Sequence, residues 1–239
     1  MSPDDIPVIQ LDKVFHIGTL DPASRGKNAG GSSLEGHCLS VSLCPHAWRY
    51  IARLGGNPLW EMRKPGARFV DLTALHEKGL VPEVIEWAKA EKLVVETKLW
   101  KSWTFDDEAD EWRYVLCMSE EDALEECDYG KGPDGRPGAE EVTVPVGTWK
   151  LGSVTGAKVQ GDEDATDFAL LAYAMQVPGA DGAWWRERFD PDILSAPRGA
   201  IFPDKVMAWR REQARWSEVD DEAELEEFER LIAPPVPRP

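Results

Sequence analysis

The sequence predicts an α+β protein. Short segments with the apolar patterns of β-strands recur along the 239 residues, and several follow one another with only a turn between them. Other segments have apolar residues at helical spacing and carry helix start and stop residues. Hydrophobic residues make up 42% of the chain, which is enough to form a sizeable core.

The N-terminal elements are expected in the order strand, loop, strand, helix, at residues 7–19, 20–36, 37–43 and 44–56. The loop is rich in Gly, Ser, Asn and Lys, which favour irregular backbone. The helix is well marked, because Pro45 stands near its start and two glycines, Gly55 and Gly56, end it.

Further strands are expected at 58–62, 67–72, 99–118 (two strands around an acidic turn), 141–154, 181–190 and 196–202. Further helices are expected at 72–94, 119–130, 164–178 and 202–232, the last as one helix or two. Ser119 and Asp122 form a variant capping box. The apolar run of the third of these helices also suits a buried strand, and we prefer the helix.

No repeat or clear linker divides the sequence. We therefore expect one main domain over 1–213, followed by an acidic helix and a Pro-rich tail over 214–239. The helix at 217–232 has only one narrow apolar stripe, and its like charges repel at i,i+4 spacing. We expect it to face solvent and to add little to the core.

The formal net charge of −17 restricts the partners. A chain this acidic is repelled by phosphate backbones, so nucleic acid is not expected as a partner. No apolar run is long enough to span a membrane, and the N-terminus carries acids where a secretion signal needs bases. We therefore expect a cytoplasmic protein with reduced cysteines and no membrane partner, which can bind a protein partner through its acidic C-terminal helix.

Two histidines and two cysteines lie close together at His37, Cys38, Cys44 and His46. This cluster is either a metal site or a strand that leads into a helix. Zinc needs four ligands around one tetrahedron, whereas the first two residues of the cluster point to opposite faces of a strand. The chain has neither a CxxC nor an HxxxH pair, so we expect no metal site.

The segment from FHIGT through LSVS to PHAWRYIARLGG resembles the N-terminal half of the ADP-ribosyltransferase-like fold, which includes RNA 2'-phosphotransferases and several bacterial toxins. The matching residues are His16, Gly18, Thr19, Ser40, Ser42, Pro45 and Trp48. Ile17, between His16 and Gly18, departs from the plain HGT motif of the family. The later segment DGAWWRERFDP resembles a third motif strand of the phosphotransferases.

This resemblance implies a split, mainly antiparallel β-sheet with flanking helices, and NAD as the cofactor. NAD cleavage passes through an oxocarbenium-like transition state, which a carboxylate near the ribose can stabilise. The implied NAD-binding residues are His16, Gly18, Thr19, Ser40, Ser42 and Trp185. Glu187 and His16 are the implied catalytic residues, with Asp181 and Asp190 as alternative carboxylates.

Several other residues are candidates for contacts with such a ligand. Loop residues Arg25, Lys27 and Asn28 suit the pyrophosphate. Arg198, between Pro197 and Gly199, suits a ligand-facing turn, although it is equally suited to pairing with a surface acid. Tyr50 is an alternative to Trp185 for stacking on the nicotinamide.

The expected function is that of an intracellular NAD-dependent ADP-ribosyltransferase-like enzyme acting on an unknown acceptor, as a toxin, effector or anti-phage factor. The alternative is a non-enzymatic acidic protein, of the antitoxin or immunity type, that masks a basic partner. The first predicts histidine, serine and carboxylate groups that converge in a cleft. The second predicts a flat acidic surface with these residues dispersed.

Overall fold

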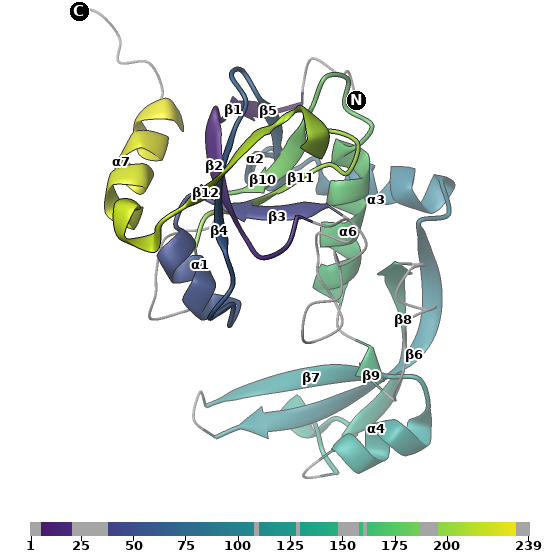
Figure 1. Cartoon of the computed structure of the whole chain (residues 1–239). Coiled ribbons are helices and arrows are strands. Elements are labelled where there is room, and N and C mark those ends of the chain that lie inside the picture. Colours follow the sequence, from purple (N-terminus) through teal and green to yellow (C-terminus); the bar gives the residue numbers. More distant parts are fainter. Residues whose placement is uncertain are drawn as a thin grey trace, which may run out of the picture. The chain divides into compact units, whose positions relative to one another are not determined.

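The computed structural model of the chain describes residues 6–20, 38–107, 110–127, 130–147, 158–159, 162–186 and 196–232 (Figure 1). The chain divides into two compact units, and the second is inserted in the first. Unit 1 consists of residues 1–81 and 171–239, and unit 2 of residues 82–170. No change of composition had indicated this division in the sequence.

Unit 1 is built on one mixed sheet. Its strands are β1 (Val8–Gln10), β2 (Lys13–Ile17), β3 (Leu39–Ser42), β4 (Leu59–Arg63), β5 (Arg68–Asp71), β10 (Gly182–Trp185), β11 (Arg198–Ile201) and β12 (Arg210–Ala214). They lie in the order β1-β5-β10-β11-β3-β2-β4-β12, and β5 and β10 form the parallel pair in this order. The model therefore confirms an α+β fold with a mostly antiparallel sheet.

Strands β2 and β3 have fewer residues in register than any other neighbouring strands of this sheet. These strands are in register at one position, Phe15 with Ser42, whereas β2 pairs with β4 over all five of its residues.

Five helices belong wholly or partly to unit 1: α1 (Pro45–Ile51), α2 (Leu72–Glu77), α3 (Val81–Ala90), α6 (Asp162–Ala174) and α7 (Asp221–Ile232). Two short 3-10 turns, η4 (Val206–Ala208) and η5 (Trp216–Glu218), flank β12. Helix α2 is capped by Asp71, whose carboxylate accepts a hydrogen bond from the backbone N–H of Ala74.

Two predicted helices are confirmed. The helix expected at 164–178 corresponds to α6, and the helix expected at 44–56 corresponds to α1.

The core of unit 1 occupies both faces of the sheet. On one face, Trp184 is fully buried and meets Phe69 edge-on at a ring-centroid distance of 5.8 Å. On the other, Phe15, Ile17 and Leu59 are covered by residues that include Trp48 of α1. Trp184 and Trp185 point to opposite faces, as expected for neighbours on a strand.

The prediction for residues 202–232 was wrong in its first half. Residues 210–214 form the edge strand β12, which pairs with β4 over five residues from Arg210 with Arg63 to Ala214 with Leu59. The open edge of β4 offers a complete row of backbone hydrogen-bond partners, and this pairing outweighs the helical preference of a polar segment.

The expectation that the C-terminal helix adds little to the core was also wrong. Phe228 of α7 is only 4% exposed, and its ring lies 5.8 Å from that of Trp184. Leu225 packs against the same core. A narrow apolar stripe is sufficient here because one large aromatic residue fills a place in the core.

Asp221, the first residue of α7, caps the N-terminus of α1, although the two are far apart in the sequence. The local N-cap residue of α1, Cys44, makes no side-chain capping bond. The two carboxylate oxygens of Asp221 instead accept hydrogen bonds from the backbone N–H groups of His46 (3.1 Å) and Ala47 (2.9 Å). These are donors that the first turn of a helix leaves without an intrahelical partner.

Unit 2 has an antiparallel sheet of four strands in the order β8 (Ala139–Gly147), β6 (Val94–Asp106), β7 (Glu111–Cys117) and β9 (Lys158–Val159). Helix α4 (Glu120–Glu126) follows β7, and the turn η3 (Pro133–Gly135) precedes β8. The predicted capping box is present, since Ser119 accepts from the backbone N–H of Asp122 and donates to its carboxylate. No helix in the described part of the chain is both long and apolar enough to cross a membrane.

Candidate functional site

Three predicted candidates lie in one row across the sheet of unit 1. Trp185 is in register with Arg198, and Arg198 is in register with Ser42. Residues in register on adjacent strands share a face, and adjacent strands are about 4.8 Å apart. The side chains of β10, β11 and β3 therefore form one row, in which Trp185 and Ser42 are buried (7% and 1% exposed) and Arg198 is partly exposed.

The guanidinium of Arg198 lies between two tryptophans. Its carbon is 4.9 Å from the ring centroid of Trp185 and 5.9 Å from that of Trp48 on α1. Both distances suit cation–π attraction. The sequence identified each of these residues separately, but residues 137 positions apart in the chain could not be assigned to one group from spacing alone.

Ser40 lies on the same face, two residues before Ser42. Its neighbour across the strand pair is Ala200, which pairs in turn with Ala183. The hydroxyl oxygen of Ser40 is buried and has no hydrogen-bond partner among the described residues, and the same holds for the indole nitrogen of Trp185. A buried polar group without a partner costs about 1–3 kcal/mol, so such groups need an explanation.

The indole nitrogens of Trp184 and Trp209 are also without partners in this part of the molecule. Both belong to the apolar core on the reverse face, beside Phe69. An unpaired indole is therefore not by itself a site in this protein. Ser40 is different because it lies on the opposite face, in the row next to that of Arg198 and Trp185.

Ser42 has a structural role. Its hydroxyl donates to the carbonyl of Pro197 at 2.7 Å and accepts from the backbone N–H of Cys44 at 3.0 Å. Only 1% of the residue is exposed. Its hydroxyl thus ties β3 to the residue before Arg198 and to the start of α1.

The register places His16 on the reverse face of β2, because its neighbour Phe15 shares the face of Ser42. One ring nitrogen of His16 lies 2.8 Å from the carbonyl oxygen of Ser40, and the other lies 3.1 Å from that of Thr19. His16 bridges β2 and β3 just where their pairing stops. The structure thus connects it to the backbone of Ser40 rather than to the row of side chains.

Gly18 and Thr19 follow β2. Gly18 has φ +125°, and its N–H donates to Pro58 while its carbonyl accepts from the indole of Trp60, each at 2.9 Å. Both backbone groups of Gly18 are thus engaged within the protein. Thr19 is exposed, and its carbonyl faces His16.

Asp181 is the one candidate carboxylate in the described residues. It is 5% exposed, forms an ion pair with Lys64, and accepts from the backbone N–H of Arg68 at 3.0 Å. It precedes β10, at the opposite end from Trp185, which suits a structural role. Glu187 and Asp190 lie outside the described residues, as do the loop candidates Arg25, Lys27 and Asn28.

The described residues of the His/Cys cluster at 37–46 make contacts within the protein. Burial, together with the charges of Asp221 and Glu224, raises the pKa of the Cys44 thiol to about 12, so it is protonated at neutral pH. His46 lies with one ring nitrogen 3.1 Å from the carbonyl of Val219. His37 lies outside the described residues, and the remainder contain no group of three or more His, Cys, Asp and Glu suited to a metal ion.

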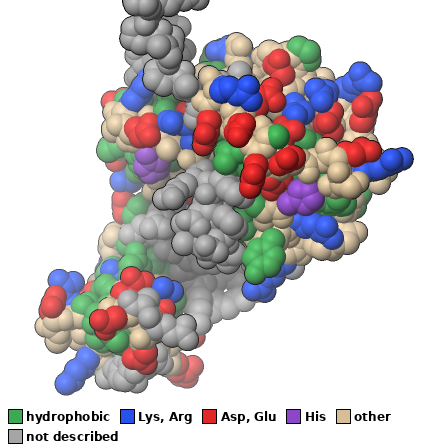
Figure 2. Space-filling model, turned by 90° about the vertical axis from the view of Figure 1, so that its left-hand side faces the viewer, with side chains coloured by type: hydrophobic (Ala, Val, Ile, Leu, Met, Phe, Trp, Pro, Cys, Tyr) green, Lys and Arg blue, Asp and Glu red, His purple; other side chains and the backbone are tan. Residues whose placement is uncertain are grey.

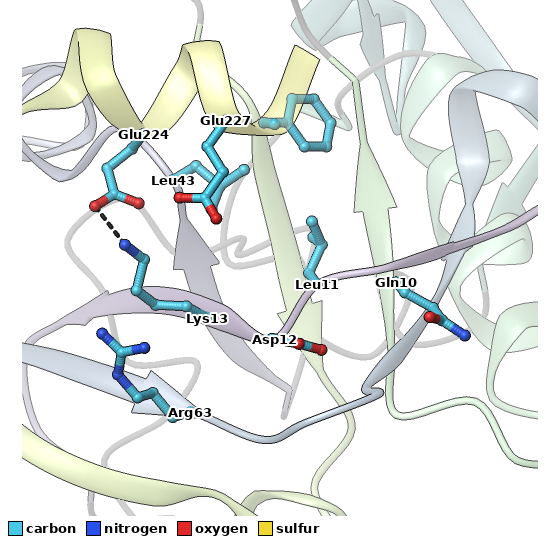
Figure 3. A pocket seen from close by; sticks show the side chains of 9 residues that line it. Gln10, Leu11, Asp12, Lys13, Leu43, Arg63, Glu224 and Glu227 are labelled. Carbon is cyan, nitrogen blue, oxygen red and sulfur yellow. Dashed lines mark hydrogen bonds and ion pairs between the residues drawn. The ribbon is translucent and has the colours of Figure 1, made fainter. Parts of the chain in front are cut away.

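A separate pocket of about 370 Å³ lies under α7 (Figure 3). It has the buried apolar residues Leu11, Leu43 and Phe228 in its wall, and Lys13 forms an ion pair with Glu224 at its edge. Its full lining is Gln10, Leu11, Asp12, Lys13, Leu43, Arg63, Glu224, Glu227 and Phe228. Three acids against two bases make it unfavourable for a polyanion. Sequence analysis did not find this pocket, because its lining comes from four distant segments.

Comparisons of the chain with protein-family models, with curated proteins and with solved structures found no match. The assignment of function therefore rests on the geometry of the site.

Proposed function

We propose that the protein is an ADP-ribosyltransferase-like enzyme that uses NAD and acts as a toxin, effector or anti-phage factor. The observation that carries this proposal is the unsatisfied hydroxyl of Ser40 on the face of the sheet that also carries Arg198 and Trp185 in the next row.

The residue types suit the parts of NAD. Arg198 can donate two parallel hydrogen bonds to a phosphate, and its charge offsets that of the pyrophosphate. A ligand hydroxyl or amide would satisfy the free hydroxyl of Ser40, which now has no partner in the described structure. The indole of Trp185 can stack on a planar ring and donate from its nitrogen.

In this proposal His16 is a positioning residue. Its two ring nitrogens lie within hydrogen-bond distance of the carbonyls of Ser40 and Thr19, and so connect the end of β2 to β3. A neutral imidazole carries one ring proton, so it can donate to only one of two carbonyls. Loss of this ring would free the β3 backbone and weaken NAD binding as well as turnover.

The chemistry requires heterolysis of the bond between the nicotinamide nitrogen and the ribose. Nicotinamide leaves with the bonding electron pair, and a nucleophile of the acceptor forms the new bond to the same ribose carbon and loses its proton. Glu187 is the proposed carboxylate that stabilises the positive charge developing on the ribose. Asp181 is the weaker candidate, because Lys64 already neutralises it.

The direct test is incubation of the protein with NAD, with and without cell extract, while nicotinamide release and the mass gain of acceptors are followed. We expect Glu187→Gln to abolish release with little change in melting temperature, and His16→Ala to raise the NAD concentration needed. Glu222→Gln, which removes an exposed carboxylate of α7, is the control for the loss of one negative charge. Absence of nicotinamide release under every condition would refute the proposal.

A non-enzymatic role remains the second candidate. The net charge of −17 favours a protein that masks a basic partner. Figure 2 shows acidic side chains spread over the surface on one side of the molecule, with basic ones among them. This alternative predicts tight binding to a cationic protein and no consumption of NAD.

A further inference from the structure

The end of the β6–β7 hairpin in unit 2 is a two-stranded ribbon. Strand β8 is in register with β6 only as far as Ser102, and β9 is in register with β7 only at Leu116 and Cys117. From Thr104 to Asp106, β6 is in register only with β7 among the described residues. Figure 1 shows the joined ends of these strands extending past α4.

One face of this ribbon carries two successive aromatic pairs. Trp103 is in register with Tyr114, and Phe105 with Trp112. The rings of the first pair lie 5.4 Å apart at 66°, and those of the second lie 5.2 Å apart at 64°. Side chains two residues apart share a face, so the two pairs are consecutive rows with nearly the same geometry.

The first row already holds a cation. The ammonium nitrogen of Lys101 lies 4.3 Å from the ring centroid of Trp103 and 3.8 Å from that of Tyr114. Lys101 is two residues before Trp103 on the same face. This contact shows that a cross-strand aromatic pair on this ribbon accommodates an ammonium group.

The second row has the same form without a cation of its own. Within the described part of the chain, the rings of Phe105 and Trp112 contact each other, and no Lys or Arg lies over either. Both rings are partly exposed. The row after them continues with Asp106 and Glu111, and then the strands turn.

Acidic residues follow the second row towards the end of the ribbon, with Asp106 and Glu111 on the reverse face and Asp107 and Asp110 beyond them. Arg113 pairs with Asp106 at 3.1 Å and with Glu111 at 2.8 Å, which leaves Asp107 and Asp110 without an ion pair in the described structure. A partly exposed aromatic pair with exposed carboxylates two residues further along each strand attracts a cation.

We infer that the Phe105–Trp112 pair, with Asp107 and Asp110, is a docking site for a Lys or Arg side chain in a basic segment of a partner protein. The ring pair would take the cation as the first row takes Lys101, and the carboxylates would attract it. A nucleic acid is disfavoured by the acids, and a second copy by a net charge of −17 on each chain. The inference does not depend on NAD, because it uses residues of unit 2 alone.

The test uses the full-length protein and a labelled octa-arginine peptide, with octa-citrulline as its neutral counterpart. Binding is followed by fluorescence anisotropy at about 0.15 M ionic strength, where distant surface charges are largely screened. We expect octa-arginine to bind and octa-citrulline not to bind. Trp112→Leu keeps an apolar side chain without a π face, and should weaken binding about fivefold, whereas Trp112→Phe should change it less.

A matched pair of charge variants separates a defined site from general attraction. Asp107→Asn with Asp110→Asn removes two charges at the ribbon, and Glu121→Gln with Glu125→Gln removes two from exposed positions on α4. The ribbon double variant should weaken binding at least threefold more than the α4 one. The inference would be overturned if the two double variants lost equal affinity, or if octa-arginine did not bind. It would also be overturned if Trp112→Leu still melted cooperatively and bound octa-arginine as tightly as the parent.

Discussion

The carboxylate of Asp221 accepts hydrogen bonds from the backbone N–H groups of His46 and Ala47, 174 residues away from the latter in the chain. The start of α7 is thereby fixed to the start of α1, beside the end of β3. This contact links the C-terminal helix to the segment on which the proposed site depends.

Removal of this cap should destabilise the protein. We expect Asp221→Ala to lower the free energy of unfolding by about 1–2 kcal/mol, the usual cost of losing a capping carboxylate. Urea denaturation measures the change. Glu222→Ala, one residue later on the exposed side of α7, is the control and should stay within about 0.5 kcal/mol of the parent. Equal losses in both variants would mean that helix charge, rather than the cap, stabilises the contact.

The Phe228 side chain should be more important for stability than its acidic helix suggests. Phe228→Ala leaves a cavity against Trp184 and should cost about 3–5 kcal/mol. Thermal melting shows this as a lower midpoint, and truncation before residue 217 should have a larger effect. Glu229→Ala on the next residue is the control. A truncated protein with an unchanged melt would show that α7 is dispensable.

Cys44 should be unreactive in the folded protein. Its pKa is raised to about 12 by burial and by Asp221 and Glu224, so almost no thiolate exists at pH 8. Brief treatment with iodoacetamide, followed by peptide mass mapping, should label the partly exposed Cys127 well before Cys44. Labelling of both cysteines at one rate without unfolding would contradict this.

The same shift makes stability depend on pH. The raised pKa means that the folded state retains the thiol proton between about pH 9 and 12, whereas the unfolded state loses it. The stability that Cys44 contributes is therefore complete below pH 9 and falls as pH rises towards 12. The difference in unfolding free energy between the parent and Cys44→Ala should shrink over this range. A constant difference up to pH 10.5 would argue against the shift.

Ser40→Ala separates function from stability. The hydroxyl has no partner among the described residues, so its removal should leave the unfolding free energy unchanged or raise it by up to about 1 kcal/mol. NAD turnover should nevertheless fall. Ser42→Ala, which removes two hydrogen bonds, is the opposite case and should destabilise the fold. Full NAD turnover by a stable Ser40→Ala protein would exclude the serine from the site.

Elements defined by local pattern were predictable from the sequence. Pro45 and the glycine pair marked α1, and strand alternation placed Ser40 with Ser42 and separated Trp184 from Trp185. The failures came from long-range partners. The polar segment that forms β12 has no apolar alternation, and it is a strand only because β4 has an open edge.

The candidate site divides in the same way. The residue types were visible in the sequence, but the stacking of Arg198 between Trp48 and Trp185 depends on which strands are neighbours. The side of β2 on which His16 lies could be determined only once Phe15 was known to pair with Ser42. The insertion of unit 2 could not be recognised from composition, because the chain passes between the units at residues 81–82 and 170–171. Both points lie within helices, α3 and α6, and not in a linker.

The insertion of residues 82–170 also sets an order for synthesis on the ribosome. Unit 2 emerges whole while unit 1 still lacks β10, β11, β12 and α7, including the strand between β5 and β11. At about 5–20 residues per second, the first half of unit 1 waits several seconds for these partners. Its apolar strands are exposed during that interval, and the N-terminus of α1 acquires its cap only after residue 221 leaves the exit tunnel. Chaperone dependence during translation, rather than low final stability, is therefore the expected weakness of this chain.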